Sequence, residues 1–370
     1  MDTDSLATST PEAPEAASLA TGDIPIAGDP SSACEPEPIE PKSCDVTAMG
    51  ELLIDFTQAG TSPGGQVLFE RNPGGAPANV LVAAARLGLS TQFVGKVGAD
   101  AQGDFLRATL EAEGVCTNGL IQDGDAFTTL AFVEVDPSSG ERSFSFARRP
   151  GADVMLRPDE VSLEALDTCR VLHVGSISLT DDPARSATIF AVREAADAGA
   201  LISYDPNYRP ALWPDPQTAV EEISDLLGSA DLLKMNHEEA RLIFATDDEE
   251  EAACMALARG VRLVAITHGG TGAYLATHGA QVRVPACPAT CADTTGAGDA
   301  FWGAVLAWLL RDRGVRTAAD VDALGPDELA ACGAFACAAA ACCVQSRGGM
   351  PAMPTRAQVE ERLAAATGAA

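Results

Sequence analysis

The chain has 370 residues, with 53 acidic side chains against 24 basic ones and a formal net charge of -29. This excess of negative charge repels a nucleic-acid backbone and an anionic membrane surface, so we expect neither as a partner. No stretch of about 18 uninterrupted apolar residues occurs, and an N-terminus that is acidic from Asp2 and Asp4 onward is typical of neither a secretory signal nor a transit peptide, so we expect a soluble, cytoplasmic protein.

Residues 1–45 differ in composition from the rest of the chain. They are rich in Pro, Ala, Ser, Thr, Asp and Glu, with Lys42 as the single basic residue and hardly any large apolar side chains. Such a segment cannot bury enough apolar surface to offset the conformational entropy that ordering would cost. We predict a disordered acidic tail over residues 1–45 and one folded domain over residues 46–367.

From Val46 onward, short β-rich segments alternate with amphipathic helical ones. The strands are predicted at 48–54, 92–97, 171–174, 201–204, 232–235 and 261–267, and the helices at 78–87, 105–113 and 184–196, then near 296–311, 327–345 and 355–366. This alternation predicts an α/β fold with a mostly parallel central sheet and helices on both faces.

Two segments do not fit the alternation. Residues 65–70 form a predicted strand that no crossover requires, and residues 128–135 and 142–148 flank the turn sequence Asp136-Pro137-Ser138-Ser139-Gly140, which predicts a hairpin. We therefore expect a small second set of strands near 65–70 and 128–148.

Eleven cysteines in a chain without a signal peptide are interpreted as reduced thiols rather than a disulfide framework. No His and no further pair of Cys stands at a zinc-like spacing from Cys287 and Cys291. We expect most of the thiols to be small buried side chains, with a redox switch at Cys342 and Cys343 as the open alternative.

The most informative motif is Asp293-Thr294-Thr295-Gly296-Ala297-Gly298-Asp299, which runs directly into the apolar helical segment 300–306. Glycines that open a helix leave unpaired N–H groups and the positive end of the helix dipole around the carboxylate of Asp299. An anion cradle beside one base is nearly sufficient for phosphoryl transfer, in which the protein mainly positions the reactants and neutralises charge. The alternative for the motif alone is an ordinary glycine-rich helix start with a capping aspartate.

Further motifs precede this one in a fixed order: Gly50-Glu51-Leu52-Leu53-Ile54-Asp55, Gly74-Gly75-Ala76-Pro77-Ala78-Asn79, Gly95-Lys96-Val97-Gly98-Ala99-Asp100, Asp205-Pro206-Asn207, Asn236-x-x-Glu239 and Gly269-Gly270-Thr271-Gly272. Together, over about residues 46 to 365, the set resembles the ribokinase-like (PfkB) carbohydrate kinases. The residues around the motifs resemble the fructokinase branch of that family. The resemblance implies a ribokinase-like fold in which the extra strands form a small β lid over the sugar.

The resemblance also implies a role for each motif. Asp299 is expected to act as general base, and Gly296, Ala297 and Gly298 as the anion hole. Asp55, Gly75, Asn79 and Arg149 are expected to contact the sugar. ATP is expected at Asn207, Asn236, Thr267, Gly269, Gly270 and Gly272, and Mg²⁺ at Glu239 through water.

Three departures from the family pattern are visible. His268 stands where leucine is usual, and Gly349 and Gln345 replace commoner residues in the string Val344-Gln345-Ser346-Arg347-Gly348-Gly349-Met350-Pro351, which resembles the family's closing loop. With Asp293, that loop often holds a monovalent cation in the family, so K⁺ activation is a hypothesis for this chain.

The leading interpretation is an ATP-dependent fructokinase that makes fructose 6-phosphate. The alternatives are a kinase for another small acceptor (ribose, 2-keto-3-deoxygluconate or adenosine) and a kinase-like scaffold protein, since a fold alone does not prove activity. A homodimer formed through an exposed lid edge is a further hypothesis.

Overall fold

A computed structural model describes Met1 and residues 42–135 and 142–367. The predicted tail therefore lies almost wholly outside the described residues, as does the Asp136–Gly140 turn. Cys44 and Asp45, which the sequence analysis placed in the tail, instead open the first strand.

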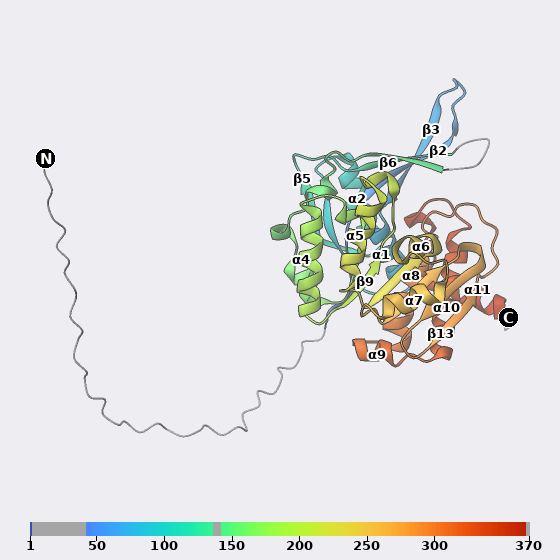
Figure 1. Ribbon diagram of the computed structural model, residues 1–370. Helices are drawn as coiled ribbons and strands as arrows, with labels where there is room; N and C mark the ends of the chain where they lie inside the picture. The colour runs from blue at the N-terminus through green and yellow to red at the C-terminus, as the bar shows by residue number, and fades with distance from the viewer. Residues whose placement is uncertain (2–41, 136–141, 368–370) are drawn as a thin grey trace. The chain divides into compact units, whose positions relative to one another are not determined.

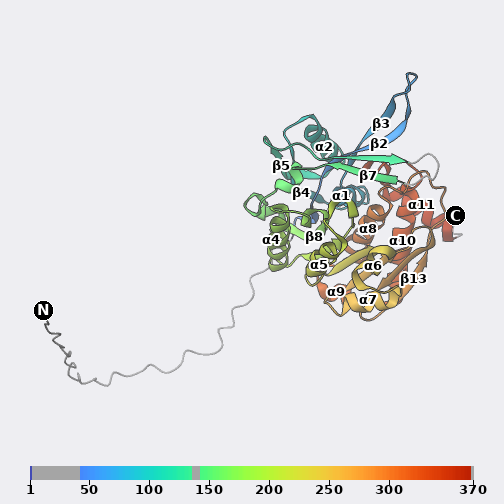
Figure 2. The same cartoon turned by 45° about the horizontal axis from the view of Figure 1, so that its top comes forward.

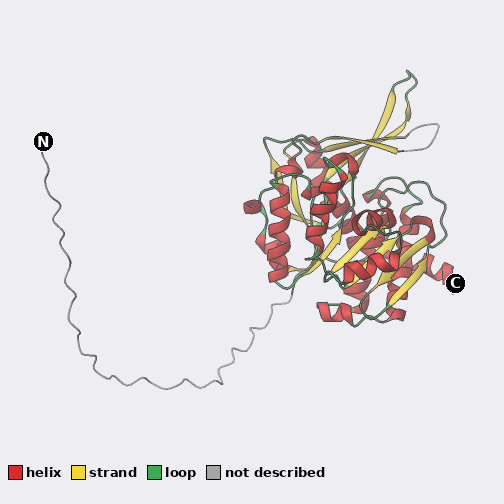
Figure 3. Cartoon of the chain, viewed as in Figure 1, coloured by secondary structure: helices red, strands yellow, loops and turns green. Residues whose placement is uncertain are grey.

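The described residues form one nine-stranded sheet and one four-stranded sheet, flanked by helices (Figures 1 and 3). The strands are β1 Cys44–Met49, β2 Leu53–Thr61, β3 Val67–Gly74, β4 Thr91–Gly98, β5 Cys116–Asp123, β6 Leu130–Val135, β7 Arg142–Ala147, β8 Cys169–Gly175, β9 Leu201–Asp205, β10 Leu232–Asn236, β11 Leu263–Thr267, β12 Gly272–Ala276 and β13 Gln281–Pro285. The α-helices are α1 Ala76–Arg86, α2 Ala101–Ala112, α3 Leu163–Thr168, α4 Ala184–Asp197, α5 Pro216–Leu227, α6 His237–Phe244, α7 Glu249–Leu257, α8 Ala297–Ala307, α9 Ala318–Asp322, α10 Pro326–Cys343 and α11 Arg356–Thr367.

The large sheet has the order β13-β12-β11-β10-β9-β8-β1-β4-β5. The pairs from β11 through β5 are parallel, and only β12 and β13 add to the edge in antiparallel fashion. The predicted mostly parallel α/β fold is confirmed, although the sequence analysis did not predict β5, β12 or β13.

Helices cover both faces of this sheet. Successive side chains along a strand pack alternately against the helices of one face and of the other. In β11, Leu263 and Ala265 pack in the core that holds α1, α8 and α10, whereas Val264 and Ile266 pack in the core that holds α4, α5, α6 and α7. Because successive side chains of a strand point to opposite faces, a five-residue apolar strand can serve both layers at once.

The small sheet, with the order β3-β2-β6-β7, is the β lid. Strands β2 and β3 form an antiparallel pair that extends beyond the helical layers (Figure 2). The stacked rings of Phe56 and Phe132, with centroids 5.3 Å apart, and the edge of Phe69 form its aromatic cluster. Val67 and Leu68 on β3 are exposed, so the lid has apolar surface that the described residues do not cover.

The predicted strand at 48–54 is wrong, because it spans a crossing between sheets. The chain leaves the large sheet after Met49, and Ile54 pairs with Leu130 of β6 and Pro73 of β3 in the lid. Asp55 therefore lies near the start of lid strand β2 and not at the end of the first strand of the large sheet.

Helix α10 is long and apolar enough to cross a membrane by length and composition alone. Its buried residues, among them Leu329, Phe335 and Ala338, pack in the core shared with α8 and α1. Burial in this core accounts for its composition.

Candidate active site

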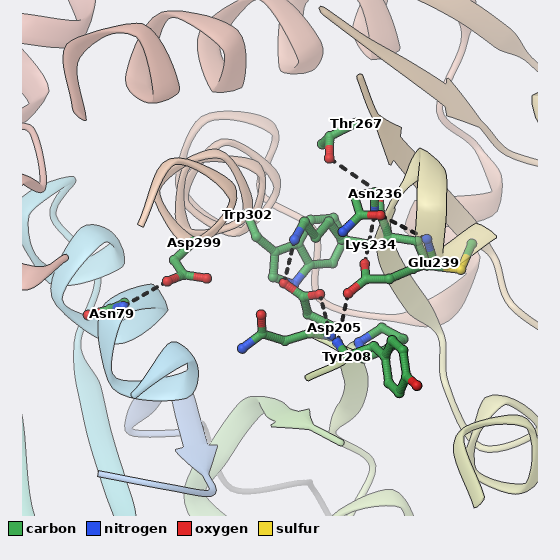
Figure 4. Close-up of polar contacts among 12 residues, drawn as sticks. Asn79, Asp205, Tyr208, Lys234, Asn236, Glu239, Thr267, Asp299 and Trp302 are labelled. Carbon is green, nitrogen blue, oxygen red and sulfur yellow. Dashed lines mark hydrogen bonds and ion pairs between the residues drawn. The ribbon is translucent and has the colours of Figure 1, made fainter. Parts of the chain in front are cut away.

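Three neighbouring parallel strands of the large sheet end in polar side chains. Asp205, Asn236 and Thr267 are the last residues of β9, β10 and β11, and Asn236 is paired with Thr267 across the sheet. Open α/β sheets bind ligands at this carboxyl edge. Figure 4 shows the three residues around Lys234, with Asn79 and Asp299 beside them.

The first turn of α8 combines an open helix end with a buried carboxylate. Its N-cap, Gly296, has a φ of 78°, which glycine adopts without strain, and no side chain caps the helix. The positive end of the helix dipole is therefore available to an anion. Asp299 lies in this turn, is 9% exposed, and accepts a hydrogen bond of 2.7 Å from Asn79 Nδ2.

The environment of Asp299 makes its carboxylate more basic than usual. Burial raises the pKa of Asp299 to about 6; Lys234, the Asn79 hydrogen bond and Arg209 act against this rise, and Asp205 adds to it. At pH 7 the group is mostly ionised and still able to take a proton, which suits a general base.

Lys234 brings a positive charge to the same helix end. Its ammonium forms an ion pair of 2.7 Å with Asp205 Oδ2, and both side chains are buried. A Cβ atom added to Gly298 would lie 2.9 Å from Lys234 Nζ, so the ammonium lies directly against the glycine-rich turn. Burial acts to lower the pKa of Lys234, but Asp205, Glu239 and Asp299 outweigh it and hold that pKa above its ordinary value.

Two further polar side chains, Asn79 of α1 and Asp55 of the lid, interact with Asp299. Asn79 is buried, and its Oδ1 has no hydrogen-bond partner among the described residues, although its Nδ2 is bonded to Asp299. Burial raises the pKa of Asp55 to about 6; Arg209 lowers that pKa and Asp299 raises it, so the two carboxylates act on each other. A buried unpaired carbonyl oxygen is costly without a partner, and a ligand hydroxyl would supply the missing donor.

Glu239 and Asn236 cap helix α6 reciprocally. Asn236 Oδ1 accepts a 2.8 Å bond from the backbone N–H of Glu239, and Glu239 Oε2 accepts one of the same length from that of Asn236. Glu239 Oε1 also accepts a 2.8 Å bond from the backbone N–H of Tyr208. The carboxylate thus fixes the loop after β9 to the start of α6, and a water-mediated contact to Mg²⁺ stays a prediction.

Asp293 joins the glycine-rich turn to the closing loop, residues 344–351. Its Oδ1 accepts hydrogen bonds from the N–H and hydroxyl of Thr295, both at 2.8 Å, and its Oδ2 accepts one of 3.1 Å from the N–H of Gly348. The carbonyl of Val344 in turn accepts the N–H groups of Ala292 and Asp293. The loop is therefore part of the wall of the candidate site.

Comparison with known proteins agrees with this geometry. The pfkB family carbohydrate kinase model matches residues 44–356. The chain belongs to this family. It is 40% identical over 317 residues to fructokinase-1 of Zea mays, which covers 85% of this chain and 96% of that protein.

Solved structures of family members share the fold. A fructokinase from Xylella fastidiosa with bound ATP superposes with a TM-score of 0.81 at 33% identity, covering 87% of this chain and 99% of that one. A fructokinase double mutant from Vibrio cholerae O395, in a form with bound fructose, ADP and potassium ion, gives a TM-score of 0.76 at 31% identity with the same coverage. The predicted ribokinase-like fold is confirmed, and the protein is a carbohydrate kinase, a phosphotransferase.

The predicted nucleotide residues lie around one tight connection: Thr267 ends β11, Gly269 and Gly270 lie in the turn that follows, and Gly272 opens β12. Gly269 has a φ of 55° and Gly272 one of 121°, and a Cβ atom at Gly272 would lie 2.0 Å from the carbonyl oxygen of Val284. The imidazole of His268 within this turn contacts the carboxylate of Glu249 of α7, and its ring lies 5.1 Å from that of His237. The histidine is thus bound to the neighbouring helices.

The two arginines after β7 differ sharply. Arg148 is buried and bonds Asp153, Thr180 and the carbonyl of Ile177, which ties the lid to the body. Arg149, the predicted sugar ligand, is exposed. Its sugar contact stays a prediction.

Sequence reasoning missed Lys234 and Arg209 as site residues. Lysine at the centre of the apolar strand Leu232-Leu233-Lys234-Met235 was a signal, because a strand buried on both faces excludes a charge that has no partner. Arg209 stands two residues beyond the predicted Asn207, whose own N–H donates to Asp205 Oδ1 at 3.2 Å and whose φ is 45°.

The ten cysteines within the described residues fall into three groups by exposure. Cys44, Cys169, Cys332, Cys337 and Cys343 are buried, Cys287 and Cys342 are half-buried, and Cys116, Cys254 and Cys291 are exposed. Burial raises the pKa of the Cys343 thiol to about 12, with Asp299 and Asp293 acting in the same direction. This thiol donates to the carbonyl of Thr295 at 3.6 Å, behind the glycine-rich turn, and the high pKa disfavours the thiolate that a redox switch requires.

Proposed function

We propose that the protein is an ATP-dependent fructokinase that converts D-fructose to D-fructose 6-phosphate. The observation that carries the proposal is the buried Asp299 at the open end of α8, hydrogen-bonded to Asn79 on one side and close to the charge of Lys234 on the other. The fructokinase names of relatives at about 40% identity support fructose as the acceptor.

In the proposed reaction, Asp299 accepts the proton of the acceptor hydroxyl as its oxygen attacks the γ-phosphorus of ATP. The bond from that phosphorus to the β–γ bridging oxygen breaks, and its electrons leave with ADP. The N–H groups at Gly296 and Gly298 and the ammonium of Lys234 stabilise the charge on the transferred phosphoryl oxygens. The N–H of Ala297 donates to the carbonyl of Thr294 at 3.2 Å and would have to exchange that partner for a phosphoryl oxygen. A base with a pKa of about 6 is matched to this task at neutral pH.

The sugar would be held where unpaired polar groups converge. Asn79 Oδ1 accepts one hydroxyl, and Asp55 can accept two. Gly75, the N-cap of α1, has a φ of 114°, and a side chain there would collide with the carbonyl of Glu51 at 2.3 Å, so the turn that leads to Asn79 requires glycine. Closure of the lid would exclude water that otherwise competes as acceptor.

Mg²⁺ bound with the nucleotide would neutralise its β- and γ-phosphates. Among residues 42–135 and 142–367, no group of three or more His, Cys, Asp or Glu side chains is arranged to hold a metal ion. This fits an ion held mainly by phosphates and water, with Glu239 as the acid proposed to reach it through water. Asp293 and the closing loop are the proposed site for K⁺. Equal turnover rates in sodium and potassium buffers would exclude K⁺ activation.

A cavity of about 550 Å³ is the proposed site of the nucleobase. It is lined by the closing-loop residues Gln345 and Ser346 together with Cys287 and Arg362, and its volume is in the range of small-ligand sites. The carbonyl of Val344, next to these residues, bonds the glycine-rich turn, so a base bound there would lie close to the helix end that receives its phosphates.

We further propose a cytoplasmic homodimer that covers the lid. Strand β3 lies at the edge of its sheet, and Val67 is 53% and Leu68 46% exposed. Analytical ultracentrifugation of the wild type and a Leu68→Glu variant checks this. A monomeric wild type would exclude the dimer.

A coupled ADP-release assay over fructose, ribose, 2-keto-3-deoxygluconate and adenosine tests the acceptor. Fructose should give the highest kcat/KM. A higher value for another acceptor would reassign the substrate, and absence of turnover with all of them would favour the scaffold alternative.

A further inference from the structure

Glu51 is a buried acid that the proposed mechanism does not use. It lies in residues 50–52, where the chain crosses from the large sheet to the lid, and it is 2% exposed. Its Oε1 accepts a hydrogen bond of 3.0 Å from the backbone N–H of Ala76, the first residue of α1, whereas its Oε2 has no hydrogen-bond partner among the described residues. Taking a carboxyl group out of water is costly, so the bond to α1 is the contact that needs explaining.

Helix α1 begins without a capping side chain of its own. Its N-cap, Gly75, has no side chain, and Pro77 in the first turn has no backbone N–H. From 25 positions away, Glu51 supplies an acceptor to this helix end and faces the positive end of its dipole. Helix α8 also begins at a glycine without a capping side chain, but its end is open to an anion. The fold therefore closes one of these helix ends and leaves the other for the phosphates.

The crossing and the start of α1 also fit closely together. A Cβ atom at Gly75 would lie 2.3 Å from the carbonyl oxygen of Glu51, so the two backbones are in direct contact. The crossing leads into β2, which carries Asp55, and the helix carries Asn79 in its first turn. Glu51 thus joins the two segments that hold the proposed sugar ligands.

A short series of hydrogen bonds leads from Glu51 to the proposed base. The carbonyl of Gly75 accepts a 2.9 Å bond from the N–H of Asn79, and Asn79 Nδ2 donates a 2.7 Å bond to Asp299. The Gly75 carbonyl and the Ala76 N–H belong to one planar peptide group, so an acceptor that fixes the N–H also fixes the carbonyl. Glu51 therefore acts on Asn79 through a rigid unit.

We propose that Glu51 is a positioning residue for sugar phosphorylation: by holding the peptide group between Gly75 and Ala76, it sets the first turn of α1 from which Asn79 contacts Asp299 and the sugar. This inference deepens the proposed function and rests on it for the identity of the ligand. It gives a role to the acid of the motif Gly50-Glu51-Leu52, which the mechanism leaves without one.

The bond to Ala76 requires a carboxyl oxygen but not a full negative charge. Burial raises the pKa of Glu51 to about 7; Asp153 adds to this rise, and the Ala76 bond and Arg148 act against it. At neutral pH part of the Glu51 carboxyl is protonated, so glutamine, which keeps Oε1 as an acceptor, should preserve the bond. Aspartate keeps the acid but is one methylene shorter, so it should lose the bond.

The proposal predicts a specific pattern among variants of Glu51. Glu51→Ala and Glu51→Asp should lower kcat/KM for fructose roughly 10- to 100-fold, the effect of a displaced positioning group, with the KM for ATP unchanged. Glu51→Gln should stay close to the wild type. Glu328→Ala is the matched control, since Glu328 Oε2 accepts a 3.0 Å bond from the N–H of Gly325, the N-cap of α10, where none of the proposed site residues lies. It should leave fructose kinetics unchanged.

The deciding experiment measures amide hydrogen exchange in the first turn of α1, alongside fructose kinetics, in the wild type and the three Glu51 variants. The amides of Ala76 and Asn79 should exchange roughly tenfold faster in Glu51→Ala and Glu51→Asp, and at the wild-type rate in Glu51→Gln. In an Asn79→Ala background, Glu51→Ala should have almost no further kinetic effect. If Glu51→Ala does not fold, the Gln and Asp variants make the same comparison.

The two readouts separate this inference from the proposed function. The expected exchange pattern without fructose turnover by the wild type would support the positioning of Asn79 and remove only the proposed function. Unchanged exchange in Glu51→Ala, a Glu51→Gln variant as impaired as Glu51→Ala, or a kinetic effect that persists in the Asn79→Ala background would overturn the positioning role. Fructose turnover by the wild type would stand in each of these cases.

Discussion

The carboxyl edge of the large sheet and the lid sheet are built in opposite ways. At the sheet edge, charged side chains are buried and already paired, as Lys234 is with Asp205 and Glu239 with the N–H groups of Asn236 and Tyr208. The lid is one layer of strands with an aromatic cluster around Phe132 and exposed apolar residues on β3.

This difference in construction suggests a division of roles, with phosphoryl transfer at the sheet edge and sugar recognition in the lid. Groups that act on the phosphoryl transfer must be fixed before the substrate arrives, because preorganised charges stabilise the transition state without reorganisation. A lid of one layer of strands, with an exposed edge at β3, is suited to closing over a sugar. Changes at the sheet edge should therefore reduce kcat, and changes in the lid should raise the KM for the sugar.

The largest effect is expected for Asp299→Asn. Loss of a general base should lower kcat by about 10²- to 10⁴-fold with little change in the melting temperature. Steady-state kinetics and thermal unfolding check this, with the exposed Asp197→Asn as control. Near-normal turnover would remove Asp299 from the mechanism.

The next largest effect is expected for Lys234→Met. It should lower kcat by about 10²-fold or more, and by leaving Asp205 buried without a partner it should destabilise the fold by about 3–5 kcal/mol. The double variant Lys234→Met/Asp205→Asn removes both charges, so it should recover stability in chemical denaturation but not turnover. Recovery of both would make the lysine purely structural.

Arg209→Gln should change the pH profile more than the maximal rate. Arg209 lowers the pKa values of both Asp55 and Asp299, so its removal raises them. Since the base must be ionised, activity lost on acidification should begin at a higher pH in the variant. Arg209→Lys keeps the positive charge, so its activity should fall on acidification at the same pH as that of the wild type. If activity falls at the same pH in all three proteins, Arg209 does not lower the pKa of the base.

The smallest effect is expected in the lid. Phe132→Ala removes a stacked ring, an interaction of about 0.5–1.5 kcal/mol, and should raise the KM for the sugar roughly 2- to 10-fold with kcat nearly unchanged. A large fall in kcat would show that the lid also affects phosphoryl transfer, and would contradict the division of roles between the lid and the sheet edge.

The sequence predicted local features better than connections between sheets. The start of α8 was found within one residue, because the glycines and the apolar run are local signals. The strand predicted at 48–54 failed since β-rich composition does not reveal that Gly50 to Leu52 cross from one sheet to the other. The short antiparallel strands β12 and β13 were missed, as they lack a helix between them to mark the alternation.

The candidate site divides in the same way. Asp299 and Asn79 were identified from motifs. They are 220 positions apart in the sequence, and the structure brings them into hydrogen-bond contact. The ion pair of Lys234 with Asp205 could not be predicted from spacing, because it depends on β9 and β10 being neighbours in the sheet.

The most direct test of the account is fructose-dependent ATP turnover by the full-length protein between pH 5 and pH 8, with the product identified by NMR. The account predicts fructose 6-phosphate and ADP in equal amounts, with kcat/KM rising through an apparent pKa near 6, the value set by burial of Asp299. No fructose-dependent turnover at any pH, or a rate that does not change across this range, would contradict it.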